Sequence, residues 1–449
     1  MALTAAARSI GAGLTGRDLE FRGCSTDSRT TVPGELFIAI KGELFDGHDF
    51  VETAGQRGAC AALVEKEVAT QLPLLVVGNT RQAMGKLAHH WRKSFTVPVV
   101  AVTGSNGKTT VKEMLVNILS LQAPVLATQG NLNNDIGVPL TLFGFGDEHR
   151  FAVIEMGANH PGEILWLSEI TQPTVSLITQ CAPAHLEGFG TVERVAMAKA
   201  EIFSGLDKNG VAVINADDDF AGMWREKTKT FRQISFGLDQ GADVTARLIT
   251  AAAAGDGTDF VLRTPAGEID ISLKLLGRHN VMNALAASAC ATGLNIGLDV
   301  IRQGLQKIRP VKGRLQRKTG INHSTVIDDT YNANPASLTA ALNVLKPFAG
   351  RHWLALGDMG ELGTGAEALH AEAGKIAKRS GMERLFAIGP LSTAAVRTFG
   401  DGAKHFTDIT RLVAQVRAEI TSDVTILVKG SRAMQMERVV RGLEAGNAC

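Results

Sequence analysis

Apolar and polar residues follow one another along this chain in blocks that predict buried strands separated by helices. The run 97–103 is apolar and β-branched, which favours a buried strand, and it leads directly into a turn bracketed by glycines. After this turn, apolar residues recur at helical spacing on one helix face. They are Val111, Met114, Leu115, Ile118 and Leu119. The pattern therefore predicts a strand, a glycine loop and a helix in direct succession.

The same pattern divides the chain into three sections, which predicts an α/β protein of three domains. Residues 1–80 alternate short apolar runs with Gly- and Asp-rich turns. The apolar runs are 35–40, 61–64 and 74–77. This alternation of short apolar runs and turns predicts a small mixed α/β domain at the N-terminal end.

The second section, residues 81–312, begins near a helical stretch at 80–93. Helical segments separate its early strand candidates, which is typical of a parallel sheet with crossover helices. The candidates are 97–103, 151–155, 174–179, 211–214 and 233–236. Shorter alternating runs near 240–275 indicate an antiparallel patch, and an Ala-rich helix is predicted over 280–292.

The third section, residues 313–449, alternates strands with helices. The expected strands are 325–328, 353–356, 385–388 and 425–428. Several of them end at Gly or Asp, where an open α/β sheet binds ligands at the carboxyl ends of its strands. We therefore expect a doubly wound domain here.

Composition and charge narrow the possible functions. The chain has 449 residues, with 46 Lys and Arg against 45 Asp and Glu. The resulting formal charge of +1 is too small to attract nucleic acid electrostatically. Its five cysteines are scattered without C-x-x-C spacing, which indicates reduced thiols. Residues 1–13 lack the apolar core of a signal peptide, and the uncharged stretch 280–298 is too polar for a membrane span. We expect a cytoplasmic protein with no nucleic-acid partner and no membrane span.

The glycine loop after the strand 97–103 carries the most specific chemistry. It consists of Thr103, Gly104, Ser105, Asn106, Gly107, Lys108, Thr109 and Thr110. Glycines let backbone N–H groups approach phosphate oxygens, and the helix N-terminus adds its positive end. Lys108 would reach the outer phosphates while the Thr109 hydroxyl ligates Mg²⁺. The loop is shorter than the common Walker form, which would need Gly where Val102 stands, but its context predicts ATP or GTP binding.

Three further residues of the second section are candidates whose roles the residues alone leave open. Glu155 closes a strand beside the loop, where it either binds Mg²⁺ or is a solvated strand end. His185, just past the strand 174–179, is either a ligand or a loop residue. Lys199 lies in a helical run; an ammonium cannot ligate a metal, so only conversion to a carbamate would make it a ligand.

The third section offers two polar groups near strand ends. Asp328 and Asp329 either hold ribose hydroxyls or cap the following helix, and Arg314 precedes them. The run 429–432 offers Lys429 and Arg432 either to a carboxylate or phosphate, or as a solvated turn.

Taken together, these motifs resemble those of the Mur ligases over nearly the whole chain. They are Asp27–Arg29, Asp46–His48, Thr103–Thr110, Gly130–Pro139, Glu155–Ala158, Ala184–Glu187, Ala198–Glu201, Gly277–Asn280 with Asn283, Gly313–Arg314, Asp329–Pro335, Gly357–Gly363 and Lys429–Arg432. The shortened phosphate loop is the form of this family. One departure is Gly360, where a bulkier residue is expected before Glu361.

The resemblance implies a UDP-sugar-binding domain at 1–80, a central ATP-binding ligase domain at 81–312, and a Rossmann-like domain at 313–449 that closes on the nucleotide and binds the amino-acid substrate. Within the family, the chain resembles the member that joins D-alanyl-D-alanine to UDP-N-acetylmuramoyl-tripeptide in bacterial peptidoglycan precursor synthesis. ATP would convert the peptide carboxylate to an acyl phosphate, which the dipeptide amine attacks. We expect a monomer.

The same resemblance implies roles for individual residues. Two Mg²⁺ ions are expected, one held by Thr109 and Glu155 and the other by His185 with carbamylated Lys199. The expected catalytic residues are Lys108, Glu155, His185 and Lys199. Asn283 would contact adenine, while Arg314 and Asp329 reach ATP from the third domain. Substrate contacts are expected from Ser28, Arg29, Asp46, His48, Asn131, Asn134, Tyr331, Asn334, Lys429 and Arg432.

Three alternatives remain. Within the family, the chain could be the ligase that completes the tripeptide, or a folylpolyglutamate synthase. The diaminopimelate-adding ligase would show Asp-Asn-Pro-Arg, which this chain lacks, and the stretches 131–139 and 331–335 favour the D-alanyl-D-alanine ligase. From a different class, the chain could be a P-loop ATPase without ligase activity. The sequence leaves open whether the third tripeptide residue is diaminopimelate or lysine.

Overall fold

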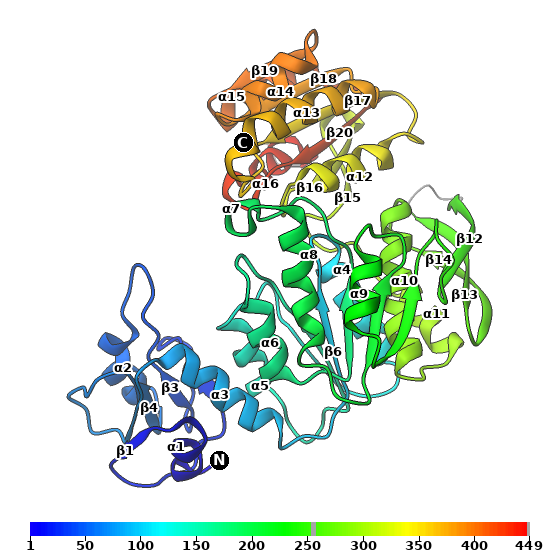
Figure 1. Ribbon diagram of the computed structural model, residues 1–449. Coiled ribbons are helices and arrows are strands. Elements are labelled where there is room, and N and C mark those ends of the chain that lie inside the picture. The colour runs from blue at the N-terminus through cyan, green and yellow to red at the C-terminus, as the bar shows by residue number, and fades with distance from the viewer. Residues whose placement is uncertain (253–256, 447–449) are drawn as a thin grey trace.

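The computed structural model describes residues 1–252 and 257–446, and these residues form three units, each built on its own sheet (Figure 1). The predicted reduced thiol of Cys449 lies outside the described residues, whereas Cys24, Cys60, Cys181 and Cys290 are free thiols. Within the described part of the chain, no helix is long and apolar enough to cross a membrane.

The first unit is a small mixed α/β fold, as predicted. In spatial order its strands are β1 (Gly13–Thr15), β5 (Leu74–Val76), β4 (Ala61–Val64), β3 (Leu36–Ile38) and β2 (Cys24–Ser25). Strands β2 to β5 are parallel, and β1 is antiparallel to β5. The inner strands β3 and β4 are buried along their whole length, which explains their continuous apolar sequence.

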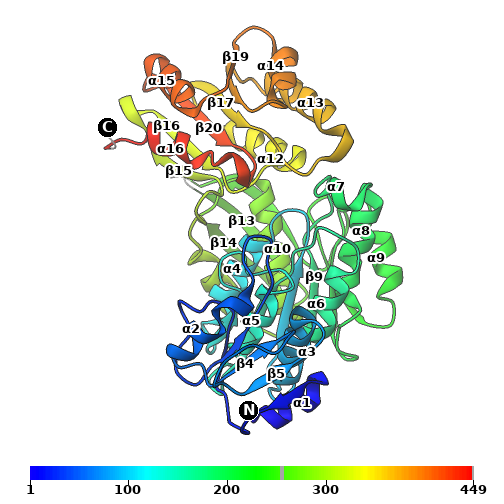
Figure 2. The ribbon, with the colours of Figure 1, turned by 90° about the vertical axis from the view of Figure 1, so that its left-hand side faces the viewer.

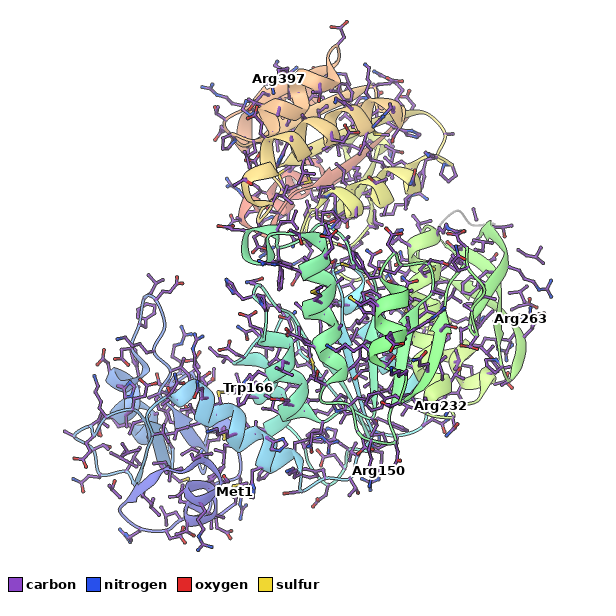
Figure 3. All side chains as sticks on the ribbon, in the orientation of Figure 1. Met1, Arg150, Trp166, Arg232, Arg263 and Arg397 are labelled. Atoms are coloured by element: carbon purple, nitrogen blue, oxygen red, sulfur yellow. The ribbon has the colours of Figure 1, made fainter. Side chains whose placement is uncertain are left out.

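Helix α3 (Thr80–Arg92) joins the first unit to the second. Asn79 caps its start by accepting a hydrogen bond from the Gln82 N–H. It packs against α1 (Leu3–Ile10) on one side and against α5 (Gly137–Phe143) and α6 (Glu163–Thr171) on the other. A Cβ on Gly85 would lie 2.4 Å from the Trp166 ring of α6, so glycine lets the helices approach closely at this junction (Figure 3).

The central unit contains an all-parallel six-stranded sheet, which confirms the prediction. In spatial order its strands are β11 (Arg232–Phe236), β10 (Val211–Asn215), β9 (Val175–Ile178), β6 (Val99–Thr103), β8 (Phe151–Glu155) and β7 (Val125–Ala127). Val100 and Val102 of β6 face α4 (Lys108–Leu119) and α10 (Arg278–Gly293), and the alternate residues face α5 and α6. Since both faces are covered, β6 is fully buried, as its apolar sequence predicts.

A small antiparallel sheet follows, as predicted for residues 240–275. Its strands are β12 (Thr245–Ala251), β13 (Thr258–Thr264) and β14 (Gly267–Leu273). Helix α11 (Leu298–Gln306) packs against β14 and α4 and so ties this sheet to the parallel one.

The third unit is doubly wound, as predicted. In spatial order its strands are β15 (Gln316–Thr319), β16 (Thr325–Asp329), β20 (Val424–Lys429), β17 (Arg351–Gly357), β18 (Arg384–Ile388) and β19 (Ala403–Phe406). All are parallel except β15. The helices on one face are α12 (Pro335–Leu345), α13 (Ala366–Arg379) and α14 (Ser392–Phe399), and those on the other are α15 (Ile409–Glu419) and α16 (Glu437–Leu443) (Figure 2).

Candidate active site

A cavity of about 1040 Å³ lies where the three units meet. The first unit contributes Glu43, and Arg81 lines the cavity from the start of α3. The central unit contributes the loop before α4 and the carboxyl end of β8, and the third unit contributes the loops that follow β16 and β20. The carboxyl ends of parallel strands from two sheets therefore face one another across the cavity.

Two glycines allow the phosphate loop to adopt its form. Gly107 precedes α4 with φ of 86°, and a Cβ there would lie 2.4 Å from Oδ1 of Asn283. Gly104 has φ of 149°, and its Cβ would lie 1.8 Å from Oγ1 of Thr179. No side chain caps α4, so its first N–H groups are available to a phosphate.

Two hydroxyls of the phosphate loop hold the loop in place. Thr103 donates to the Met156 carbonyl at 2.9 Å. Ser105 donates to the Ala182 carbonyl at 3.0 Å, and its oxygen accepts the Ala182 N–H at 3.0 Å. These side chains support the loop and join it to the segment that carries His185, while their backbone remains near the cavity.

Two lysines of the central unit have unusual electrostatic surroundings. Lys108 donates to the Gly104 carbonyl at 2.7 Å, and burial lowers its pKa. Lys199 of α8 (Val192–Ala200) is 3% exposed, and burial, with a contribution from Lys108, lowers its pKa to about 7. Within the described residues, the Lys199 amine has no hydrogen bond or ion pair. A large fraction of it is therefore an uncharged nucleophile near neutral pH.

Glu155 at the end of β8 has one oxygen bonded and one free. Its Oε1 accepts a hydrogen bond from Nδ2 of Asn133 at 2.8 Å. The backbone N–H of Glu155 donates to Oγ1 of Thr128 at 2.9 Å, which fixes the strand end. Oε2 is buried and has no partner. An unpartnered buried carboxylate oxygen fits a cation, because burial without one is unfavourable.

The third unit reaches the phosphate loop through polar contacts. Arg314 donates to Oγ1 of Thr109 at 3.1 Å, and its guanidinium lies 4.2 Å from the centre of the Tyr331 ring. Asn334 donates to Oδ1 of Asn106 at 2.9 Å. These side chains connect the two units through polar contacts, which can be exchanged for contacts with a ligand.

A second polar contact between these units joins His185 to Glu361. Nδ1 of His185 pairs with Oε2 of Glu361, and this hydrogen bond lowers the pKa of the Glu361 carboxyl. Both residues have a left-handed backbone, with φ of 54° for His185 and 61° for Glu361. Such conformations are strained for side chains other than Gly and Asn, so both side chains are held in set directions.

The carboxylate of Asp329 is neutralised inside the third unit. Nζ of Lys429 lies 2.5 Å from its Oδ2 and also donates to the Asn332 carbonyl at 3.0 Å. The Leu315 N–H donates to Oδ1 at 3.2 Å. Burial and the nearby Lys429 lower the pKa of His279 to about 4, so this imidazole is neutral at neutral pH.

Comparison with known proteins places the chain in a family. The description "Mur ligase family, catalytic domain" matches residues 20–97, "Mur ligase middle domain" matches 102–291, and "Mur ligase, glutamate ligase domain" matches 313–432. The UDP-N-acetylmuramoyl-tripeptide--D-alanyl-D-alanine ligase of Escherichia coli K12 is 44% identical over 439 residues, 97% of this chain and 96% of that protein. The chain belongs to the Mur ligase family.

Solved structures agree with this assignment over the whole length of this Mur ligase. A crystal structure of MurF from Acinetobacter baumannii is similar with a TM-score of 0.92 and 37% identity, covering 97% of both chains. MurF from Thermotoga maritima in complex with ADP is similar with a TM-score of 0.84 and 27% identity, covering 95% of this chain and 98% of that one. The three-unit architecture is thus that of the Mur ligase fold.

The structure brings most of the predicted nucleotide and metal residues of this Mur ligase to one cavity. Those that line it include Ser105, Asn106, Gly107, Lys108, Thr109, Thr110, Glu155, His185, Asn283, Arg314 and Asp329. The predicted substrate residues Asn134, Tyr331, Asn334 and Lys429 line it too. The roles of these residues remain predictions.

Other predicted residues lie away from the described cavity lining. Arg29 pairs with Asp27 in an exposed loop, beside the buried Ser28, and Arg432 pairs with Glu437 at 3.1 Å. Asn131 is exposed. Thr103 and Gly104, which begin the phosphate loop, and the buried Lys199 lie outside the cavity lining. As substrate or nucleotide residues, they remain predictions.

His48 illustrates a role that the sequence did not indicate. Its Nδ1 lies 2.5 Å from Oδ1 of Asp46, and its Nε2 accepts the Glu65 N–H at 2.8 Å. Oε1 of Glu65 in turn accepts the Thr80 N–H at the start of α3 at 2.9 Å. Both imidazole nitrogens are therefore engaged in supporting the entry to α3. A direct contact of Asp46 and His48 with substrate stays a prediction.

Three side chains of the site were not singled out from the sequence of this Mur ligase. Asn133 orients Glu155, Glu361 reaches His185, and His279 lines the cavity at the start of α10. Asn133 and His279 lie inside motifs that support the family resemblance, and glycines at 360 and 363 flank Glu361. These motifs and glycines do not identify the residue that each side chain contacts, because Glu155 and His185 lie far from Asn133 and Glu361 in the sequence.

Proposed function

We propose that this Mur ligase joins D-alanyl-D-alanine to UDP-N-acetylmuramoyl-tripeptide in peptidoglycan precursor synthesis, using ATP and an acyl phosphate. One observation carries the proposal: the phosphate loop and an unpartnered buried Glu155 oxygen line one cavity that all three units enclose. The buried Lys199 amine lies outside this lining but close enough to Lys108 for that charge to lower its pKa. The name of the E. coli relative, 44% identical over nearly the whole chain, supports this substrate pair. The ADP complex of the T. maritima neighbour supports an adenine nucleotide.

The chain's own groups explain the first chemical step. A carboxylate is a poor acylating agent, so one of its oxygens is converted to a leaving group by phosphoryl transfer from ATP. This transfer brings anions together, and its transition state needs preorganised positive groups. Lys108 and the free N–H groups of α4 supply them from the central unit, while Arg314 reaches the same loop from the third unit. Asn283, which lies beside Gly107, is proposed to contact the adenine.

The residues present fit Mg²⁺. Among the described residues, no group of three or more His, Cys, Asp or Glu side chains is arranged as a metal cage. Mg²⁺ commonly binds through one or two carboxylates together with nucleotide phosphates, which matches the unpartnered Oε2 of Glu155 and the hydroxyl of Thr109. When bound there, Mg²⁺ neutralises charge on the phosphates. His185 would hold the second ion.

Lys199 is proposed to work as a carbamate beside His185. Its uncharged amine can attack carbon dioxide, forming an N–C bond and releasing one proton, and the product has one negative charge shared by two oxygens. The low pKa of about 7 supports this reaction, because only the free amine has the required lone pair. The carbamate reverses the charge of a group that would otherwise oppose a cation at this site.

The units take separate substrates in this proposal. Residues 1–80 bind the UDP-sugar, residues 81–312 bind ATP, and residues 313–449 close on the nucleotide and bind the dipeptide. Asn134, Tyr331, Asn334 and Lys429 line the shared cavity and are the substrate contacts best supported by position. We further propose that the enzyme acts as a monomer.

Phosphate release with D-alanyl-D-alanine and a panel of UDP-muramoyl peptides tests the function. The proposal expects release only when ATP, the dipeptide and a UDP-muramoyl tripeptide are all present, and the panel identifies the third residue. Release with a UDP-muramoyl dipeptide and a single amino acid would instead indicate the ligase that completes the tripeptide. Phosphate release with a folate and glutamate would indicate a folylpolyglutamate synthase. Phosphate release with ATP alone would indicate a P-loop ATPase without ligase activity.

A further inference from the structure

The carboxylates that line the cavity differ in what neutralises them. Asp329 pairs with Lys429 at 2.5 Å, and Asp135 pairs with Arg81 at 3.1 Å. Glu361 is different, because among the described residues its ionic partner is His185, which belongs to another unit. Its side chain is 51% exposed, and His185 contacts Oε2, which leaves Oε1 available to a ligand.

The backbone around Glu361 is held in a strained form that directs this side chain. Glu361 has φ of 61°, a conformation that costs a side chain other than Gly or Asn free energy. Its carbonyl accepts the Glu187 N–H at 3.3 Å, and nearby the Met359 N–H donates to Nε2 of the buried His370 at 2.9 Å. Strain that persists in a well-anchored loop is characteristic of functional sites.

The position of this carboxylate matches the route of the second substrate. Glu361 contacts the loop of His185, and Ser105 of the phosphate loop is bonded to the same segment through Ala182. A group held by Glu361 therefore lies beside the phosphate site, on the side of the third unit. This is where an amine must approach an acyl phosphate formed at that site.

The neighbouring loop supplies the opposite charge. The Ser431 N–H donates to the Asp358 carbonyl at 2.9 Å, which joins the loop of Glu361 to the run 429–432. Arg432 in that run lies outside the cavity lining, its side chain is 67% exposed, and among the described residues it pairs with Glu437 at 3.1 Å. One anion and one cation on adjoining loops complement a zwitterion, such as a free dipeptide.

We propose that Glu361 binds the ammonium group of the incoming amine substrate and directs its nitrogen toward the acyl phosphate. This inference rests on the proposed ligase function and assigns its amine-binding residue. An α-amino group titrates at about pH 8, so the dipeptide arrives mainly as the ammonium form. Glu361 is then the counter-ion that holds the ammonium until it loses one proton to water. The free amine forms the N–C bond, and the acyl C–O bond to phosphate breaks as phosphate leaves.

Steady-state and trapping measurements on the full-length enzyme test this assignment. At saturating ATP and UDP-tripeptide, Glu361→Gln should raise the KM for D-alanyl-D-alanine by about tenfold or more, since a charged hydrogen bond is lost. Glu361→Asp should recover part of this loss. Glu187→Gln is the matched control, because Glu187 lies at the same junction but is exposed outside the cavity, and its KM should stay within about twofold of wild type.

An uncharged nucleophile separates ammonium binding from a purely structural role. Hydroxylamine in place of the dipeptide attacks the acyl phosphate, forms an N–C bond and releases phosphate, but it offers no ammonium near neutral pH. Hydroxamate formation should therefore be nearly equal for wild type and Glu361→Gln. Equal losses with dipeptide and hydroxylamine would overturn the proposal and show that Glu361 only positions His185. An unchanged dipeptide KM would also overturn it.

The same assays keep this inference distinct from the ligase function itself. If wild-type enzyme forms hydroxamate but shows no dipeptide-dependent phosphate release, the proposed function fails. If wild type ligates the dipeptide and Glu361→Gln does so with the same KM, only the role of Glu361 fails.

Discussion

The central unit and the third unit form the two main walls of the cavity, and the two walls differ in how their charged groups are partnered. The central unit holds ionisable groups without an ionic partner. Lys108 donates to a backbone carbonyl, Oε2 of Glu155 has no partner, and Lys199, outside the lining, has none among the described residues. The third unit neutralises its charges internally, since Lys429 pairs with Asp329 at 2.5 Å. Glu361 is the exception on that wall, because its partner lies on the opposite one.

This difference distinguishes charged groups that await a ligand from charged groups that stabilise the structure. An unpaired buried charge is costly, so it persists where a ligand supplies the missing partner. A paired charge is already satisfied and holds the shape of its loop. In the proposed function, the central wall receives phosphate, cations and carbon dioxide, whereas the third wall docks on it and positions the substrate.

The largest effect is expected from removing the unpaired lysine of the phosphate loop. Lys108→Ala should lose transition-state stabilisation of about 3 kcal/mol or more, or at least a hundredfold in rate, while the fold is retained. Phosphate release measures the rate, and circular dichroism with thermal unfolding checks the fold. Lys86→Ala, an exposed change on α3, is the control. Substantial ligation by well-folded Lys108→Ala enzyme would contradict the phosphate-loop assignment.

The second unpaired lysine tests the same wall through chemical rescue. Lys199→Ala should lose most activity and regain part of it with added short carboxylic acids, which can occupy the vacated oxygen site. Its thermal stability should not fall markedly, because no ionic partner is left unpaired. Lys208→Ala, an exposed change, serves as control. Near-wild-type activity of Lys199→Ala would show instead that this lysine is irrelevant to the rate.

On the third wall, removal of a lysine should lower the stability of the fold. Lys429→Met leaves the Asp329 carboxylate, whose side chain is 13% exposed, without its cation, and the free energy of unfolding should fall by about 3 kcal/mol. Calorimetric unfolding measures this loss. The double variant Lys429→Met with Asp329→Asn should recover much of it, since no charge is then stranded. If the single variant unfolds like wild type, the contrast between the walls is wrong.

The polar junction between the walls should respond to ligands. An ATP analogue with the UDP-substrate should draw the third unit onto the central one and reduce the radius of gyration in small-angle scattering. Arg314→Ala removes a contact with Thr109 and should weaken this response. An unchanged radius in wild type would show that the third unit is permanently docked or does not take part in nucleotide binding.

The smallest effect is expected from pH. His279 has a pKa lowered to about 4 in the folded protein, against about 6.5 in an unfolded chain. Between these values the unfolded state binds the proton and the folded state does not, so stability falls as the pH is lowered from about 6.5 to 4. His279→Asn should show a shallower fall in the thermal midpoint over this window. An identical slope would mean that His279 does not contribute.

The sequence by itself determined the central strands and the phosphate loop. Strands β6, β8 and β9 are buried on both faces, so each is a mainly apolar run that predicts its own burial. The phosphate loop was predictable for a similar reason, because its strand, glycines and helix are adjacent in the chain. The local pattern of apolar residues reflects which positions are buried, and the central strands are buried on both faces.

Only the tertiary structure decided the edges of the sheets and the contacts between units. The strands not predicted from the sequence, β1, β2, β7, β12, β15 and β19, all lie at sheet edges, where short and partly exposed segments lack a strong apolar pattern. The contacts of Glu361 with His185 and of Asn334 with Asn106 join residues far apart in the chain. No local pattern encodes such a pair, because its geometry exists only after two separately folded units have come together around the cavity.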